Sequence, residues 1–190
     1  MPHILKRTEF GNPILQQSAE LVKVADITGE KIQDLIASMR LTLKEKKLGV
    51  GIAAPQLNVH LALSVIDITP SKTRPNVTPF SQVIINPEII EGIGPKEGMW
   101  EGCLSFGTVN SPVFAKADRH KKIKVKFYDE HGALHDNEIL EGFPAHVFQH
   151  ETDHLNGILF PTRVSDHTTW MNAAEYRKRI ASKRDKHATS

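Results

Sequence analysis

An α+β fold is predicted for this 190-residue chain, with antiparallel or mixed strands around one central helix, an N-terminal surface helix and a C-terminal helix. Three observations predict it. Apolar residues recur at helical spacing over residues 28–47, several strand-like apolar runs lie between residues 61 and 140, and a second helical segment follows them. Because the strands mostly precede this central helix, a parallel α/β sheet is disfavoured.

Length and composition indicate one globular domain over residues 1–190, with a C-terminal helix and basic tail at about 166–190. Hydrophobic residues make up 39% and charged residues 24% of the chain. The net charge of +2 does not indicate DNA binding, and the single cysteine excludes an internal disulfide. With no signal-like or membrane-spanning run, we expect a cytoplasmic monomer without a membrane partner.

The first 27 residues read as extended and irregular, and the first helix is expected over residues 28–47. Thr28 can cap its start and Gly49 can end it. Its apolar positions, which recur at helical spacing, are Ile32, Leu35, Ile36, Met39 and Leu43. The stripe predicts a helix that packs one face on the core.

Strands are expected at residues 61–68, 82–86, 99–104, 123–128 and 133–140, the last two as a hairpin. Pro87 is expected to stop the second strand, and Gly92, Gly94 and Pro95 to form a turn. The pattern of residues 106–119 predicts neither a helix nor a strand. Pro144 can open the central helix, which Gly157 closes, and a final helix is expected over residues 167–183.

The central helix carries the sequence His150-Glu151-Thr152-Asp153-His154. Two histidines four apart lie on one helical face, so both imidazoles can bind one metal ion. The intervening Glu151 can then act as a general base on a water held by the metal. A catalytic site needs a third protein ligand, and Cys103 is the candidate. Burial as a small hydrophobe and action as a nucleophile are the alternatives for this cysteine.

Three segments, in this order, resemble the peptide deformylase family, and the resemblance implies a domain core at about residues 10–165. They are GVGIAAPQ at residues 49–56, EGCLS at residues 101–105 and QHETDHLNG at residues 149–157. Enzymes of this family remove the formyl group from the N-terminal methionine of newly synthesised polypeptides and release formate. The resemblance implies an N-formylmethionyl peptide as substrate. A nucleotide-binding glycine loop is a poor alternative for residues 49–56, since the third glycine and the lysine are missing.

The resemblance also implies roles for individual residues. Cys103, His150 and His154 would bind one divalent ion, Fe²⁺ by preference, with Ni²⁺, Zn²⁺ or Co²⁺ as alternatives. Glu151 would transfer protons, while the Gln56 amide and the Leu104 backbone N–H would hold the oxyanion.

Substrate positioning is implied in the same way. The peptide would pair with the backbone at Val50 and Gly51, with Gly102 across the groove. The methionine side chain would enter a pocket lined by Val50, Met99, Phe143, His146 and Val147.

The polar residues beside these positions have more than one interpretation. His146 could be a fourth ligand, a pocket-lining residue or a solvated one. Asp153 could orient a ligand histidine, tie down the helix or lie on its surface. Lys116 and Arg119 are both candidates for pairing with Glu101.

Departures from the family pattern leave other functions open. Phe106 and Asn110 stand where relatives have a small aliphatic residue and a substrate-facing arginine. A paralogue that acts on another N-acyl substrate, a catalytically silent metal- or peptide-binding paralogue, and a zincin protease are therefore alternatives. The basic residues that crowd positions 177–186 favour a solvated helix face or, as the resemblance allows, contact with ribosomal RNA.

Overall fold

In the computed structural model, six strands form one antiparallel sheet in the order β1-β2-β3-β4-β5, and β6 pairs with the free edge of β4. The structure describes residues 1–46, 49–70, 76–108 and 111–181. The strands are β1 Gly51–Ala53, β2 Leu63–Ile68, β3 Phe80–Thr108, β4 Ser111–Tyr128, β5 Leu134–Glu141 and β6 Met171–Asn172. The helices are α1 Glu30–Lys46, α2 Phe143–Leu155 and α3 Ala173–Tyr176. The α+β prediction is confirmed.

Short helical turns join these elements. The 3₁₀ turns are Pro13–Gln16, Val24–Asp26, Ala54–Leu57, Phe160–Arg163 and His167–Thr169, and one π-helical turn covers Arg177–Ala181. None of the helices in the described residues is both long enough and apolar enough to cross a bilayer.

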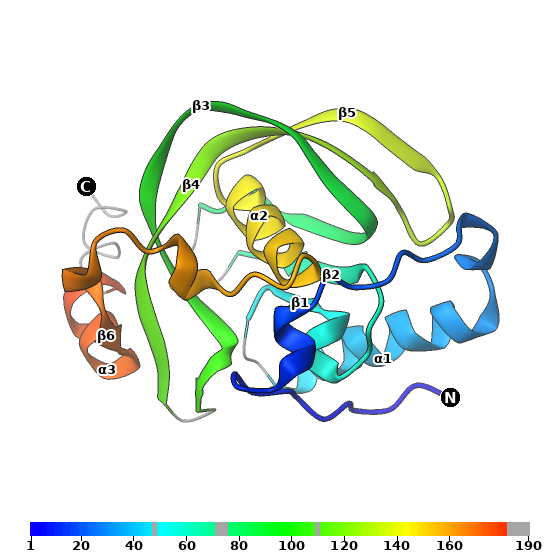
Figure 1. Cartoon of the computed structure of the whole chain (residues 1–190), viewed down its shortest axis with the longest axis horizontal. Helices are drawn as coiled ribbons and strands as arrows, with labels where there is room; N and C mark the ends of the chain where they lie inside the picture. The colour runs from blue at the N-terminus through cyan, green and yellow to red at the C-terminus, as the bar shows by residue number, and fades with distance from the viewer. Residues whose placement is uncertain (47–48, 71–75, 109–110, 182–190) are drawn as a thin grey trace.

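The two long strands β3 and β4 curve around α2, as Figure 1 shows. The prediction that Pro87 ends one strand and that Gly92, Gly94 and Pro95 form a turn is wrong, because β3 continues through all four residues. The β3–β4 register shifts between Ile85/Glu88 and between Ile93/Lys96, and Gly94 has φ +78°. A bulge tolerates a proline without an N–H and a residue with positive φ, and it bends the strand.

Helix α1 forms as predicted, and its apolar stripe packs on a core with the apolar residues of β1 and β2. Helix α2 also agrees with its prediction, with Pro144 in the first turn. Almost every residue of α2 is buried, because the helix contacts β1, β2, β3, β4 and β5 (Figure 1). The metal-ligand sequence therefore lies on the most enclosed helix of the described chain.

The helix expected over residues 167–183 forms from Ala173 onward, as α3 and the π-helical turn Arg177–Ala181, and the prediction is wrong for its start at residues 167–172. The chain first forms a 3₁₀ turn that Asp166 caps, then pairs as β6 with Val113 and Phe114 of β4. Trp170 is extended because its ring packs with Phe106 and Phe160. Helix α3 begins only after Asn172, whose side chain accepts from the Glu175 N–H. The rest of the expected helix, from residue 182, lies outside the described residues.

Candidate active site

Strand β3 and helix α2 bring three potential metal ligands together. Cys103 comes from β3, while His150 and His154 lie one turn apart on α2. Their ligand atoms all lie within 4.8 Å of one another. Cys103 Sγ lies 3.1 Å from His154 Nε2. One thiolate and two imidazoles suit a single divalent ion of borderline softness, such as zinc or iron.

Cys103 has the electrostatic surroundings of a thiolate. Burial alone would raise its pKa, but the charge of His154 and hydrogen bonds from both histidines lower the pKa to about 5. The Ser105 backbone N–H also donates to Sγ at 3.4 Å. A thiolate is the form that binds metal.

Glu151 lies buried between the two ligand histidines and strand β1. A Cβ atom added to Gly51 would lie 2.3 Å from Glu151 Oε1, so β1 can approach this closely only without a side chain there. Burial raises the Glu151 pKa to about 7, against the opposing charges of His150 and His154. Its Oε2 has no hydrogen-bond partner among the described residues. A buried carboxyl with a neutral pKa and a free oxygen suits proton transfer to a water beside a metal.

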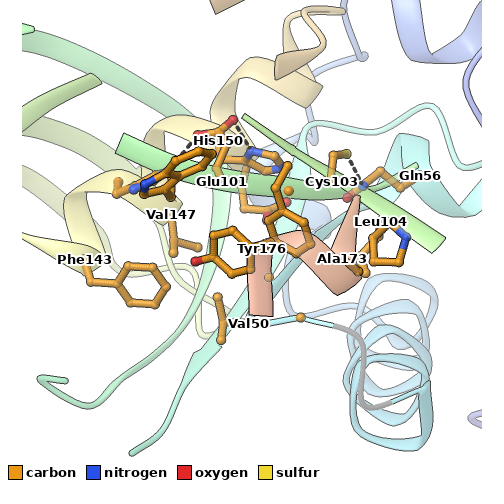
Figure 2. Close-up of a pocket in the computed structure, with 18 of the residues that line it drawn as sticks. Val50, Gln56, Glu101, Cys103, Leu104, Phe143, Val147, His150, Ala173 and Tyr176 are labelled. Atoms are coloured by element: carbon orange, nitrogen blue, oxygen red, sulfur yellow. Dashed lines mark hydrogen bonds and ion pairs between the residues drawn. The ribbon is translucent and has the colours of Figure 1, made fainter. Parts of the chain in front are cut away.

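Gln56 is held in one orientation at the other side of Cys103. The Ala53 backbone N–H donates to its Oε1 at 2.8 Å, which leaves the amide nitrogen turned toward Cys103 Sγ, at 3.7 Å, and toward Ser105 Oγ, at 3.2 Å. Figure 2 shows the contact between Gln56 and Cys103 and the position of Leu104 near them. The amide therefore presents N–H donors to the centre of the site.

Glu101 joins the metal ligands to an ion network behind them. His150 Nδ1 donates to Oε1 at 2.9 Å, and His146 Nε2 donates to Oε2 at 2.7 Å. Arg119 donates to both carboxylate oxygens, at 2.9 and 3.1 Å, which identifies it, and not Lys116, as the partner of Glu101. Burial would raise the Glu101 pKa, but His150, His146 and Arg119 hold it well below its ordinary value. With Nδ1 engaged, His150 offers Nε2 to a metal.

The same network extends along α2 to Asp153. Asp153 is buried and accepts from Arg119 and, at 2.6 and 3.0 Å, from Arg163. It therefore ties α2 to β4 and to the Phe160–Arg163 turn, and it is neither a surface carboxylate nor a partner of a ligand histidine. Arg163 was missed by sequence reasoning, because nothing in its local sequence indicates a partner ten residues away.

His146 belongs to this network and is not in the group of potential ligands within the described chain. Its ring is buried, lies edge-on to Phe143 with centroids 6.0 Å apart, and is paired with Glu101. Burial lowers the pKa of His146 below the ordinary value of a histidine. The interpretations of His146 as a fourth ligand or a solvated residue are therefore wrong. The hydrogen bond satisfies Nε2, one of the two ring nitrogens, in the pocket wall.

A cavity of about 430 Å³ opens in front of the metal ligands (Figure 2). It brings together these predicted site residues: Val50, Gly51, Gln56, Gly102, Cys103, Leu104, Phe143, His146, Val147, His150 and Glu151. His154 lies behind them, against Cys103. Met99 is not among the lining residues, whereas the next residue, Trp100, is. Trp100 reaches the cavity because its ring meets Tyr176, another lining residue, edge-on at 5.7 Å.

The structure also tests the other departures noted in the sequence. Phe106 packs against Phe10, Phe160 and Trp170, and it does not line the cavity. Asn110 lies outside the described residues. Sequence reasoning did not predict that Ala173, Tyr176 and Arg177, from the C-terminal segment, would line the cavity. A sequence pattern cannot indicate this, because these residues come close only through the β6–β4 pairing.

Comparisons with known proteins agree with this geometry. The family model "Polypeptide deformylase" matches residues 4–170. A peptide deformylase of Aquifex aeolicus is 41% identical over 92% of this chain and 96% of its own length. One of Leptospira biflexa is 40% identical over 85% of this chain and 88% of its own. A class I type b peptide deformylase from Acinetobacter baumannii, solved with Met-Ala-Ser bound, is 32% identical and has a TM-score of 0.78, covering 86% of this chain and 100% of that chain. The chain therefore belongs to the polypeptide deformylase family.

Proposed function

We propose that the cluster of Cys103, His150 and His154 beside Glu151 carries out the reaction of this family. The protein is an enzyme, a metal-dependent hydrolase that removes the N-formyl group from the N-terminal methionine of newly synthesised polypeptides and releases formate. The observation that carries the proposal is that three ligand atoms lie within 4.8 Å of one another, next to a carboxyl group whose pKa burial raises to about 7.

The donor set fits one divalent ion, which Cys103, His150 and His154 would hold. When bound, the ion supplies Lewis-acid chemistry, lowering the pKa of a water and polarising the formyl carbonyl. Fe²⁺ is the ion we propose, and Ni²⁺, Zn²⁺ or Co²⁺ can occupy the same donors. Glu101 supports the site from behind, because it accepts from His150 Nδ1 and so fixes the ring with Nε2 forward.

Glu151 is the proposed general base and acid. Its carboxylate takes a proton from the attacking water and then gives it to the leaving amine. A pKa of about 7 makes the two transfers comparably favourable near neutral pH. The Gln56 amide and the Leu104 backbone N–H are the proposed donors to the oxyanion, and the Ala53–Gln56 hydrogen bond orients the first of them in advance.

Substrate binding uses the cavity walls. We propose that the formyl peptide lies extended between the backbone at Val50 and Gly51 on one side and Gly102 on the other. Its first side chain enters the part of the cavity lined by Val50, Phe143, His146 and Val147. His146 Nε2 is engaged by Glu101 and its ring lies edge-on to Phe143, so the ring is held in place as part of the pocket wall.

The finer biological assignments complete the proposal. Residues 1–190 form one domain that acts as a cytoplasmic monomer. The basic C-terminal residues that do not line the cavity, which include Lys178 and Arg179, contact ribosomal RNA. Such contact would weaken steeply with added salt, because it depends on phosphate neutralisation. Binding to ribosomes that does not change between low and high salt, or that is absent, would contradict this part.

The alternative functions have lost their support. Phe106 lies in a core cluster and His146 is paired, so neither motivates another N-acyl substrate. A silent paralogue has no need of a general base, and a zincin protease would leave Cys103 and Gln56 unexplained.

A formate-release assay tests the function. The Fe²⁺-loaded protein is supplied with formyl-methionyl peptides and with peptides that carry other formylated residues, and metal content is measured on the same sample. We expect the fastest formate release from the formyl-methionyl peptides. Equal formate release by wild type and Glu151→Ala at equal metal content would contradict the proposal.

A further inference from the structure

The C-terminal segment, defined as Met171–Ala181, forms part of the wall of the substrate cavity. Ala173, Tyr176 and Arg177 line the same cavity as the metal ligands. All three lie beyond residues 4–170, the part of the chain that the family model matches. The family model therefore does not cover them.

Ring stacking fixes Tyr176 over the groove. The Tyr176 ring stacks on Phe114, with centroids 4.1 Å apart and planes 7° apart, and meets Trp100 edge-on at 5.7 Å. Phe114 in turn covers Gly102, where an added Cβ would lie 2.8 Å from the ring. These three rings form an aromatic wall above Gly102, the residue we place across the groove from Val50 and Gly51.

The Tyr176 side chain faces the cavity and not the core. Figure 2 shows its ring among the labelled lining residues, with the hydroxyl toward the side of Phe143 and Val147. The residue is only partly buried, and within the described chain its hydroxyl has no hydrogen-bond partner. An extended peptide that leaves the metal centre alongside Gly102 would pass against this ring.

Arg177 places a positive charge at the edge of the same wall. It is exposed, and it has no ion pair with any described residue, whereas the nearby Arg179 pairs with Glu175 at 2.5 Å. Glu101 and Glu151, the carboxylates that line the cavity, are both buried, and neither is paired with Arg177. An anion that enters the open end of the groove therefore meets a guanidinium that is free to bind it.

We propose that Tyr176 and Arg177 form a subsite for the part of the substrate that follows the formylated residue. Tyr176 contacts the second residue, and Arg177 binds the terminal carboxylate of a formyl dipeptide or tripeptide. Two or three extended residues span about 7–10 Å, so the carboxylate of a short peptide, unlike that of a long chain, falls near the groove. The proposal rests on the proposed function, and it predicts a preference for short peptides with a free carboxylate.

The Michaelis constant for a peptide acid and for its amide tests Arg177. Wild type should have a KM for formyl-Met-Ala up to about fivefold lower than for formyl-Met-Ala amide, the upper end of the range expected for one exposed ion pair. Arg177→Gln should remove this difference and leave kcat unchanged. Arg179→Gln, a matched loss of an arginine that does not line the cavity, should keep it. Equal KM values for acid and amide in wild type, or the same loss in both variants, would overturn the role of Arg177.

The matching test for Tyr176 compares two variants. Tyr176→Ala should raise KM for both peptides severalfold at constant kcat, and Tyr176→Phe should restore it, because the stacking ring is retained. An unchanged KM in Tyr176→Ala would overturn its role, as would a fall in kcat without a change in KM.

A binding measurement separates this proposal from the proposed function. Isothermal titration of the metal-loaded protein with the deformylated product, Met-Ala as acid or amide, needs no turnover. If neither wild type nor any variant released formate, the proposed function would fail. Even then, tighter binding of Met-Ala acid than of its amide, lost in Arg177→Gln, would support the subsite. Equal binding of acid and amide would overturn it.

Discussion

Two walls of one cavity are built in opposite ways. The wall formed by α2 and the middle of β3 is buried, and a continuous network joins its ionisable side chains: Glu101, Arg119, His146, His150, Asp153 and Arg163. The wall formed by the C-terminal segment is held by a two-residue strand pairing and a ring stack, and its charges are exposed. The buried wall holds the metal-ligand atoms in place for chemistry. The wall formed by the C-terminal segment can change in sequence without disturbing those atoms.

The largest expected effect lies at the chemical centre of the buried wall. Glu151→Gln keeps the size of the side chain and removes its ability to exchange a proton. Formate release should fall about 10²–10⁴-fold, the range for loss of a general acid–base group. Metal content, measured on the same preparation, should stay as in wild type. Activity within tenfold of wild type at equal metal content would show that proton transfer does not depend on this carboxyl.

The next effect concerns the stability of the buried wall. Arg119→Met removes the cation shared by Glu101 and Asp153, so both carboxylates lose a buried partner. Unfolding free energy should fall by about 3–5 kcal/mol, as expected when one member of a buried ion pair is removed. Denaturant unfolding measures this.

The exposed wall supplies the control for this comparison. Arg179→Gln breaks the Arg179–Glu175 pair there and should stay within about 0.5 kcal/mol of wild type. Similar losses in the two variants would remove the energetic contrast between the walls.

Acid should weaken the buried wall through Asp153. Burial would raise the Asp153 pKa, but hydrogen bonds from Arg163 and the charge of Arg119 lower it in the folded protein. A carboxyl with a lowered folded pKa stabilises the protein above its unfolded pKa, about 3.9, and this stabilisation is lost as pH falls through the folded pKa.

Asp153→Asn should therefore destabilise the protein at pH 7 and flatten the decline of stability below about pH 4. Unfolding midpoints measured from pH 7 to pH 2 test this. An acid decline as steep in the variant as in wild type would contradict it.

The smallest effect is expected in the C-terminal segment. Asn172→Ala removes the side-chain oxygen that accepts from the Glu175 N–H at the start of α3, a cap worth about 1 kcal/mol. We expect faster amide hydrogen exchange over Ala173–Tyr176, with α2 amides and the melting temperature nearly unchanged, because the segment can open locally. If α2 amides also exchanged faster, the two walls would be coupled.

The contrast also explains what could be predicted from sequence. Helices α1 and α2 could be predicted because apolar spacing and helix-end signals are local features of the sequence. The three potential metal ligands could also be predicted. His150 and His154 share a helical face, and Cys103 lies in a recognisable segment.

Other features depend on contacts between distant parts of the chain. The passage of β3 through Pro87 and Pro95 depends on bulges opposite β4. Trp100, not Met99, lines the cavity because its ring meets Tyr176 of the C-terminal segment. The pairing of His146 with Glu101, and the packing of Tyr176 on Phe114, join residues 45 and 62 positions apart. No local pattern encodes such pairs.

The central claim is that one ion binds Cys103, His150 and His154. Anomalous diffraction at the iron edge, from crystals of Fe²⁺-loaded protein, tests it most directly. The account predicts a single peak bonded to Cys103 Sγ and to Nε2 of both histidines, with His146 still hydrogen-bonded to Glu101. A peak bonded to His146, or one without a bond to Cys103, would contradict it.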